Sequence, residues 1–248
     1  SDDVIAETPF YRPPADSPEI KYLLERRRKL AEALQQQGQQ GLGPTEMVGG
    51  WAIPKSPMEG IEIVDGGLLN FARPEAILKR PELLIRIFEE SVVLKAPLSA
   101  EAKRLVREFA YLVDPAFRAA PETVRSFERI LLAPASAASA LDDMLTTGLL
   151  VALIPEFQFV TNRIQYDEYH LYPVDKHLLR TVQTITQLAG EGAQAEPLCA
   201  RIYRELKNKT LLFWAALLHD IGKGGTEDDH ATLGAELARG ILAAKGFT

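Results

Sequence analysis

The four histidines of this 248-residue chain are the first residues whose types and spacing could do chemistry. They are His170, His177, His219 and His230. His219 begins the dipeptide His219-Asp220, which directly follows the apolar run 211–218, and that run predicts a buried helix. An imidazole and a carboxylate at the end of a buried helix are costly unless they have partners. A divalent metal ion is such a partner, because imidazole nitrogen and carboxylate oxygen suit Mn, Fe, Zn and, less well, Mg.

A metal ion at this position needs ligands from elsewhere in the chain. Adjacent residues on a helix diverge by about 100°, so His219 and Asp220 can share an ion only when other helices contribute. We expect His177 in the first turn of one helix and His230 at the start of another. His230 shares a face with the leucines three and seven residues later, which indicates that it points inward. The predicted metal ligands are therefore His177, His219, Asp220 and His230.

Lys223 lies four residues after His219, one helical turn along the same face, where its ammonium group could meet an anionic oxygen. A divalent metal, a bound water of lowered pKa and a cation beside a phosphate together describe phosphoester hydrolysis. We therefore expect Asp220 and Lys223 to be catalytic, with Lys223 also contacting the substrate. His170, which has three tyrosines near it in the sequence, is either a further substrate contact or a hydrogen-bonded core histidine.

Each of these residues also has a purely structural interpretation. A His-Asp dipeptide alone is typical of an exposed turn, and His177 could cap a helix. His230 follows two aspartates that could form a solvated helix start. The apolar run before His219 and the Ile-Gly-Lys sequence after Asp220 favour the metal site.

The composition excludes several classes of protein. Twenty-eight Lys and Arg against 34 Asp and Glu give a net charge of −6, which argues against a nucleic-acid binder that works by broad phosphate neutralisation. The single cysteine, Cys199, rules out an intramolecular disulfide and any multi-cysteine zinc module. The longest uninterrupted apolar run has eight residues, whereas a membrane span needs about 20. No signal peptide is visible at the N-terminus, so we expect a cytoplasmic protein without nucleic-acid or membrane partners.

The elements that must position these residues are mostly helical. Residues 1–45 predict an N-terminal helix and a Gln/Gly linker, and residues 46–70 a short strand-like connector that contains the turn sequence Asp65-Gly66-Gly67. Over residues 71–248 apolar side chains recur at spacings of three and four, which predicts a helical domain. We expect an all-α fold in which a small mixed segment precedes a helical bundle. The expected helices cover residues 82–94, 99–113, 121–131, 136 or 139 to 150, 176–188, 206–221 and 231–244.

The histidine motifs resemble those of the HD metal-dependent phosphohydrolase superfamily, in which one His is followed by a His-Asp pair and a final Asp. His177 matches the first position and His219-Asp220 the second. Residues 165–177 are similar to the stretch that ends at the first metal histidine in bacterial PII uridylyltransferase/uridylyl-removing enzymes. Residues 216–224 resemble the next motif of that family, and the likeness extends over most of the chain from residue 60 to residue 240.

This resemblance implies an HD-domain helical bundle and hydrolysis of the UMP–tyrosine phosphodiester on a uridylylated PII nitrogen-regulatory protein, which would be the partner. It implies a divalent metal on His177, His219, Asp220 and His230, with attack on phosphorus by a metal-bound water and with Lys223 steadying the phosphate charge. The Gly-Ser nucleotidyltransferase motif with paired aspartates is absent from this sequence, so the uridylyl-adding activity is not expected in it. The last metal aspartate of the superfamily is expected beyond the end of the chain, so we expect the HD domain to be truncated at its C-terminal end.

Two other functions remain open at this point. One is an HD phosphodiesterase or phosphohydrolase that acts on small or cyclic nucleotides, although the Gly-Tyr-Pro motif of one such group is absent. The other is a non-catalytic regulatory HD module, in which the metal is a structural staple or the site has decayed.

Overall fold

The computed structural model divides the chain into two compact units, one made of residues 1–55 and 65–67 and the other of residues 56–64 and 68–248. The expected helix and Gln/Gly linker within residues 1–45 lie outside the described residues. The expected boundaries at residues 45 and 70 remain predictions. The structure describes residues 45–48, 51–54, 58–133, 138–163, 173–190, 194, 196–225 and 229–247.

The described part of the first unit is an antiparallel strand pair. Strand β1 (Thr45–Val48) pairs with β2 (Trp51–Pro54), with Thr45 opposite Pro54 and Val48 opposite Trp51. The sequence predicted strand-like residues from 46 to 70, a range that includes most of β1 and all of β2, but it did not predict this pairing.

A second antiparallel pair opens the described part of the second unit. Strand β3 (Ile61–Val64) pairs with β4 (Leu68–Phe71), with Ile61 opposite Phe71. The residues between them, Asp65 to Gly67, form the expected turn, in which both glycines have the positive φ that favours glycine. The side chain of Leu69 is fully buried, so the pair belongs to the core of the helical unit.

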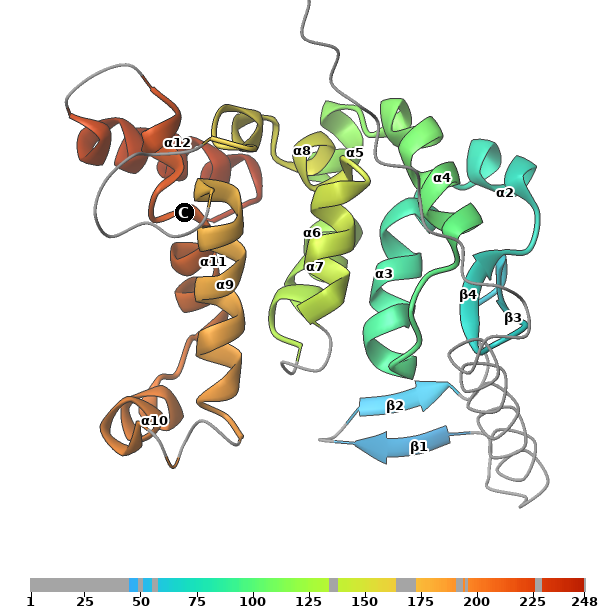
Figure 1. Cartoon of the computed structure of the whole chain (residues 1–248), viewed down its shortest axis with the longest axis horizontal. Helices are drawn as coiled ribbons and strands as arrows, with labels where there is room; N and C mark the ends of the chain where they lie inside the picture. Colours follow the sequence, from blue (N-terminus) through green and yellow to red (C-terminus); the bar gives the residue numbers. More distant parts are fainter. Residues whose placement is uncertain are drawn as a thin grey trace, which may run out of the picture. The chain divides into compact units, whose positions relative to one another are not determined.

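Helices form the rest of the second unit, which confirms the expected all-α class with a small mixed segment before it (Figure 1). Short 3-10 helices, labelled η, lie between several of them. The helical elements are α2 (Pro74–Lys79), α3 (Leu83–Leu94), α4 (Ala100–Phe109), η1 (Ala110–Leu112), α5 (Pro115–Ala119), α6 (Pro121–Leu131), α7 (Ala138–Thr146), α8 (Leu149–Leu153), η3 (Pro155–Phe159), α9 (Val174–Gln187), α10 (Pro197–Glu205), α11 (Lys209–Leu218), η5 (Ile221–Gly224) and α12 (His230–Ala244).

Local sequence signals set several helix ends as expected, and one helix differs. Ser99 caps α4 by accepting a hydrogen bond from the backbone N–H of Ala102 at 2.9 Å, and Pro121 is at the start of α6. The single helix expected up to residue 150 is instead two, α7 and α8. Gly148 separates them with a φ of 79°, a left-handed conformation that cannot continue a helix.

The two helices that carry the predicted metal ligands also begin and end at different residues than expected. Helix α9 begins at Val174, two residues before the expected start at residue 176, so Asp175 lies inside its first turn. Helix α11 begins at Lys209, because the Asn208 side chain accepts from the backbone N–H of Leu211, and ends at Leu218. The expected helix over residues 206–221 is therefore shorter, and His219 and Asp220 lie in the turn after it.

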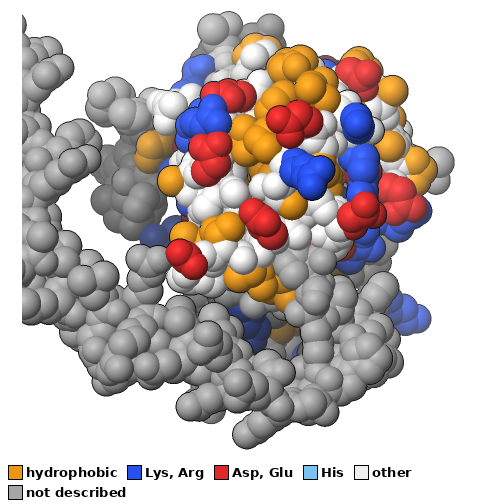
Figure 2. All heavy atoms as spheres, turned by 90° about the vertical axis from the view of Figure 1, so that its right-hand side faces the viewer, with side chains coloured by type: hydrophobic (Ala, Val, Ile, Leu, Met, Phe, Trp, Pro, Cys, Tyr) orange, Lys and Arg blue, Asp and Glu red, His pale blue; other side chains and the backbone are white. Residues whose placement is uncertain are grey.

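The surface on the side of α2 and the β3–β4 pair carries charges of both signs interspersed with apolar side chains (Figure 2). The exposed apolar residues of these elements include Ile63 and Leu78. Among the described residues on this face, Lys and Arg do not form a continuous basic surface of the kind that binds a phosphate backbone. Within the described residues, none of the helices has the length and apolar character needed to cross a bilayer.

Candidate metal centre

Helix α11 supports one half of the site because one of its faces is buried in the core. Phe213, Trp214 and Leu217 have no exposed surface, and burying each such side chain contributes about 1.5–3 kcal/mol. The indole N–H of Trp214 also donates to Glu128 Oε1 of α6 at 3.2 Å. The helix is thereby fixed in the core, and the two polar residues that follow it are held in place at its end.

Helix α9 supplies the other half of the site. It packs along α11, and Leu178 and Val182 bury one of its faces. His177 lies in its first turn, as the sequence predicted, and its Nε2 atom is 3.1 Å from Nε2 of His219. Two residues that are 42 positions apart in the chain therefore face each other through their ring nitrogens.

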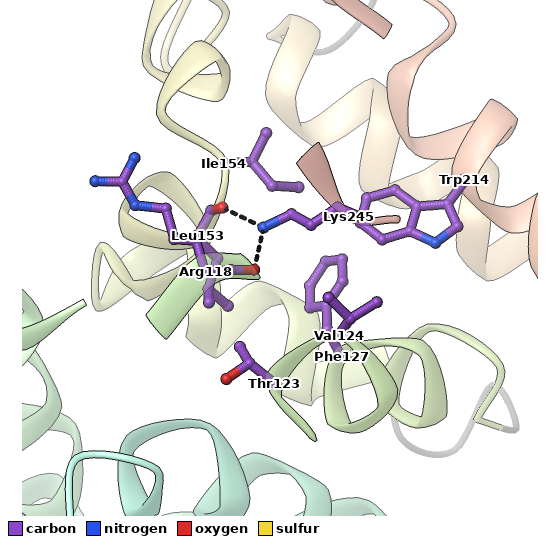
Figure 3. Close-up of a pocket in the computed structure, with 8 residues that line it drawn as sticks. All are labelled: Arg118, Thr123, Val124, Phe127, Leu153, Ile154, Trp214 and Lys245. Carbon is purple, nitrogen blue, oxygen red and sulfur yellow. Dashed lines mark hydrogen bonds between the residues drawn. The ribbon is translucent and has the colours of Figure 1, made fainter. Parts of the chain in front are cut away.

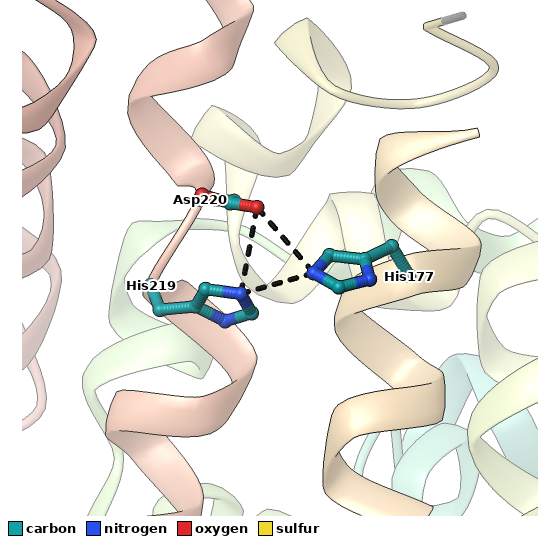
Figure 4. A group of neighbouring side chains, drawn as sticks. All are labelled: His177, His219 and Asp220. Carbon is teal, nitrogen blue, oxygen red and sulfur yellow. Dashed lines mark hydrogen bonds and ion pairs between the residues drawn. The ribbon is translucent and has the colours of Figure 1, made fainter. Parts of the chain in front are cut away.

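Asp220 completes the group (Figure 4). Its Oδ2 atom lies 3.5 Å from Nε2 of His177 and 3.4 Å from Nε2 of His219. A point equidistant from all three atoms lies about 1.9 Å from each, close to the ~2.0–2.2 Å at which imidazole and carboxylate bind a transition metal. Among the described residues, these three form the group whose ligand atoms could hold an ion.

The protonation of His219 fits a metal site. Its Nδ1 atom lies 2.8 Å from the carbonyl oxygen of Ala216, and because a carbonyl only accepts, Nδ1 must carry the proton. In the neutral ring with its proton on Nδ1, Nε2 is the nitrogen that can bind a metal, and it faces the other two ligand atoms. A backbone carbonyl that fixes the tautomer in this way is the usual second partner of a metal-binding histidine. The side chains of His177 and His219 are 34% and 38% exposed, so water or a substrate can reach the site.

Lys223 contributes the positive charge nearest to Asp220. Its Nζ atom is 3.0 Å from Oδ2 of Asp220, and its side chain is only 11% exposed. Lys223 is on η5 rather than on a continuation of α11, so it meets the carboxylate and not the face of His219. The ammonium group offsets part of the carboxylate charge in a partly desolvated position.

The segment that carries Asp220 and Lys223 is fixed by backbone packing against α12. A Cβ atom on Gly222 would lie 2.0 Å from the carbonyl oxygen of His230 and 2.5 Å from the backbone nitrogen of Gly234, so only glycine fits. Asp229 caps α12 by accepting from the N–H of Thr232 at 3.0 Å. The close approach of η5 to the first turns of α12 therefore fixes the position of Asp220 relative to the two histidines.

Comparison with known proteins agrees with this geometry. Residues 174–247 match the model of the HD domain, and these residues include the three convergent side chains. Residues 174–247 are therefore similar to an HD domain. Residues 63–153, upstream of it, match the model of the third domain of uridylyltransferase GlnD. The predicted resemblance to HD proteins and to this enzyme family is confirmed.

Three curated relatives of this chain are each named bifunctional uridylyltransferase/uridylyl-removing enzyme. The relative from Ruegeria pomeroyi is 36% identical over 191 residues, which are 77% of this chain and 21% of the relative. The relative from Methylococcus capsulatus is 41% identical over 136 residues, 54% of this chain and 15% of the relative. The relative from Thiobacillus denitrificans is 35% identical over 203 residues, 78% of this chain and 23% of the relative. The chain thus spans about a fifth of the length of these relatives.

The HD domain brings together most of the side chains that the sequence singled out. His177, His219, Asp220 and Lys223 meet in one cluster. The His230 side chain is exposed at the first residue of α12 and is not part of the three-residue group, although its backbone lies against Gly222. His170 lies outside the described residues.

Sequence reasoning did not foresee Arg163 at this site. Its guanidinium group donates to the carbonyl oxygens of Gly224 and Gly225, immediately after Lys223. Backbone acceptors leave no side-chain pattern in a sequence, so only the three-dimensional arrangement reveals this contact.

Proposed function

We propose that this chain is a metal-dependent phosphodiester hydrolase, the uridylyl-removing part of its enzyme family. The substrate would be the UMP–tyrosine phosphodiester on a uridylylated PII protein, which would also be the partner. The observation that carries the proposal is the convergence of two imidazole nitrogens and one carboxylate oxygen inside an HD domain. The name of the relatives, bifunctional uridylyltransferase/uridylyl-removing enzyme, supports the choice of substrate.

His177, His219 and Asp220 would hold a divalent ion, with Mn, Mg, Fe and Zn as the candidates. Three protein ligands leave further coordination positions open, which is typical of catalytic rather than structural sites. When bound, such an ion lowers the pKa of a water molecule and polarises a phosphoryl oxygen. The hydrogen bond from Nδ1 of His219 to Ala216 holds that ring in the orientation that binding needs.

Lys223 would offset the negative charge on the substrate phosphate. Its ammonium group is held 3.0 Å from Asp220 in a position with little access to water, where a charge acts more strongly than in bulk solvent. In the hydrolysis, a water oxygen forms a bond to phosphorus while the bond from phosphorus to the tyrosine oxygen breaks. The tyrosine oxygen gains a proton, and the products are UMP and unmodified PII.

His230 and His170 would have secondary roles. His230 begins α12 close to Gly222, and we propose it as a further ligand that adds to the three-residue group. His230→Ala should then weaken metal binding less than His219→Ala does. His170 is proposed as a contact to the substrate, and His170→Ala should raise KM without changing metal affinity.

The test measures UMP released from uridylylated PII by the metal-loaded chain, beside hydrolysis of bis(para-nitrophenyl) phosphate. We expect Mn²⁺-dependent release of UMP, and loss of that release in His219→Ala. Cleavage of the small diester without release of UMP would overturn the choice of substrate and favour a small-nucleotide phosphodiesterase. A metal-bound chain that cleaves neither compound would overturn the catalytic proposal and favour a structural metal.

A further inference from the structure

The metal centre is assembled from two segments that must be held in register. His177 comes from α9, whereas His219 and Asp220 come from the turn between α11 and η5. Ligand distances have to be correct to within about 0.2 Å for a metal site to bind well. The packing of α9 on α11 sets the distance between these helices, but it does not by itself fix the turn and η5 beyond the end of α11.

Arg163, which is not a metal ligand, forms hydrogen bonds to the C-terminal end of η5. Its Nη1 atom donates to the carbonyl oxygen of Gly224 at 2.8 Å and its Nη2 atom to that of Gly225 at 2.9 Å. The planar guanidinium fork suits two neighbouring acceptors, which a lysine could not bind in the same way. A Cβ atom on Gly224 would lie 2.4 Å from Cβ of Phe159, so η5 is also tightly packed at this end.

Asp175, on α9, binds the turn that contains Asn162 and Arg163. It is 1% exposed and lies two residues before His177. Its Oδ2 atom accepts from the backbone N–H of Asn162 at 2.9 Å, and its Oδ1 atom from that of Lys176 at 2.7 Å. Asn162 has a φ of 55°, which is uncommon for a residue other than glycine, so this bond stabilises an unusual turn.

A backbone hydrogen bond links the contacts of Asp175 to those of Arg163. The N–H of Val174 donates to the carbonyl oxygen of Arg163 at 2.9 Å. Asp175 and Val174 in the first turn of α9 therefore hold residues 162 and 163, and Arg163 holds the end of η5. This path connects the helix of His177 to the segment of Asp220 and Lys223 without using any metal ligand. A buried carboxylate is costly unless it is hydrogen-bonded. The carboxylate of Asp175 is stabilised by its bonds to the backbone N–H groups of Asn162 and Lys176.

We propose that Arg163 and Asp175 are positioning residues of the metal centre, which keep His177 in register with Asp220 and Lys223. The proposal rests on the metal site of the proposed function but does not depend on its substrate. The two residues act through the ligands and do not touch the ion or the phosphate.

The experiment titrates the full 248-residue chain with Mn²⁺ by isothermal calorimetry, well below the unfolding temperature. Arg163→Gln, Arg163→Lys and Asp175→Asn should each bind Mn²⁺ about tenfold to a hundredfold more weakly than the unaltered chain. The double variant Arg163→Gln/Asp175→Asn should bind Mn²⁺ no more weakly than whichever of its two single variants binds it less tightly. Both substitutions interrupt the same chain of hydrogen bonds, so their effects should not add.

Two matched controls separate positioning from general destabilisation. Asp142→Asn removes another carboxylate that binds α9, since Asp142 pairs with Lys176 at 2.8 Å and accepts from Gln183 at 3.2 Å, but it has no bond to the 162–163 turn. Arg204→Gln removes an arginine that donates to a carbonyl in its own helix. Both controls should keep the Mn²⁺ affinity within about twofold, a difference far smaller than the loss expected from a broken support of a metal ligand.

The outcomes distinguish this proposal from the proposed function. If the unaltered chain binds no Mn²⁺, the metal site itself is wrong, and both proposals fall. If it binds Mn²⁺ and Arg163→Gln binds equally well, the positioning role is overturned while the proposed function stands. If Asp175→Asn does not fold, the Mn²⁺ affinities of the variants at the exposed residue Arg163 test the proposal alone. A lower unfolding temperature without a change in affinity would mean a purely structural role and would overturn the proposal.

Discussion

Two polar clusters in the helical unit differ in how their atoms are satisfied. At the C-terminal end of α12, the ammonium group of Lys245 donates to the carbonyl oxygens of Arg118 at 2.9 Å and Leu153 at 3.1 Å (Figure 3). At the metal centre, ring nitrogens of His177 and His219 converge with a carboxylate oxygen of Asp220, and the ammonium group of Lys223 contacts that oxygen at 3.0 Å. In the Lys245 cluster one ammonium group matches the carbonyl acceptors. In the metal centre the two ring nitrogens and the carboxylate oxygen form a set of ligand atoms that suits a metal cation.

The position of Lys245 explains why a cation is found there. Arg118 is in the last turn of α5, Leu153 is the last residue of α8 and Lys245 follows the last residue of α12. Helix C-termini leave carbonyl groups without intrahelical partners and carry partial negative charge. The lysine meets this need within the chain, so the cluster is structural. A ligand site is therefore marked by which donor and acceptor atoms converge, rather than by polarity alone.

The largest expected effect comes from removing a ligand. His219→Ala should weaken Mn²⁺ binding by at least about a hundredfold and reduce UMP release to the uncatalysed rate, because Nε2 is the atom that joins the two halves of the site. Calorimetry and the uridylylated PII assay measure the two effects. Lys245→Met is the control and should bind Mn²⁺ as well as the unaltered chain. Equal loss in both variants would remove the distinction between the clusters.

The next effect tests whether backbone packing holds the metal centre. Gly222→Ala would place a methyl group against the backbone of His230 and Gly234, and overpacking of this kind costs up to about 3 kcal/mol of unfolding free energy. Urea denaturation measures it. Gly240→Ala in the middle of α12 meets open space and should stabilise the protein by about 0.5–1 kcal/mol. If the two variants are equally stable, η5 is not held against α12 as described.

An effect no larger than that of Gly222→Ala is expected at the structural cluster. Lys245→Met keeps the length of the side chain but leaves the Arg118 and Leu153 carbonyl groups without this donor, which costs about 1–3 kcal/mol. Denaturation without metal measures the loss. The rise in unfolding temperature on adding Mn²⁺ should be unchanged. A reduced rise would show that the two clusters are coupled.

The smallest effect concerns pH. Burial, with a further contribution from the nearby Arg118 and against the opposing effect of Glu156, lowers the pKa of Lys245 to about 8 from its ordinary 10.5. Between these values the unfolded chain binds more protons than the folded chain, so this group makes stability rise with pH. The difference in unfolding free energy between the unaltered chain and Lys245→Met should therefore grow from pH 8 to pH 10.5 in favour of the unaltered chain. A constant difference would contradict the burial of the charge.

Some of the metal centre could be predicted from sequence, because its signals are local. The apolar run before His219 predicted a buried helix, and His177 follows a helix start by three residues. Lys223 was predicted near an anionic oxygen, but from a helix that in fact ends at Leu218. The 3-10 helix η5 brings Lys223 to Asp220 instead. The expected contact of Lys223 with an anionic oxygen is present, but the helix expected to carry Lys223 is not.

The remaining features could not be predicted, because they depend on backbone groups distant in sequence. Arg163 and Lys245 both donate to main-chain carbonyl groups between 61 and 127 residues away, and every residue has such a group. Gly148 looked like part of a helix because apolar residues surround it, and only its positive φ shows the break between α7 and α8. Strand β2 was not singled out within residues 46–70, which were expected to be strand-like.

The most direct measurement of the central claim is the anomalous scattering of Mn²⁺ in crystals of the chain grown with the ion. The account predicts one strong peak at ~2.0–2.2 Å from Nε2 of His177, Nε2 of His219 and Oδ2 of Asp220, the distance typical of such ligands. The crystals should show no peak at Lys245. A map with no peak between these three atoms, or with its peak elsewhere in the chain, would contradict the assignment of this site as the metal centre.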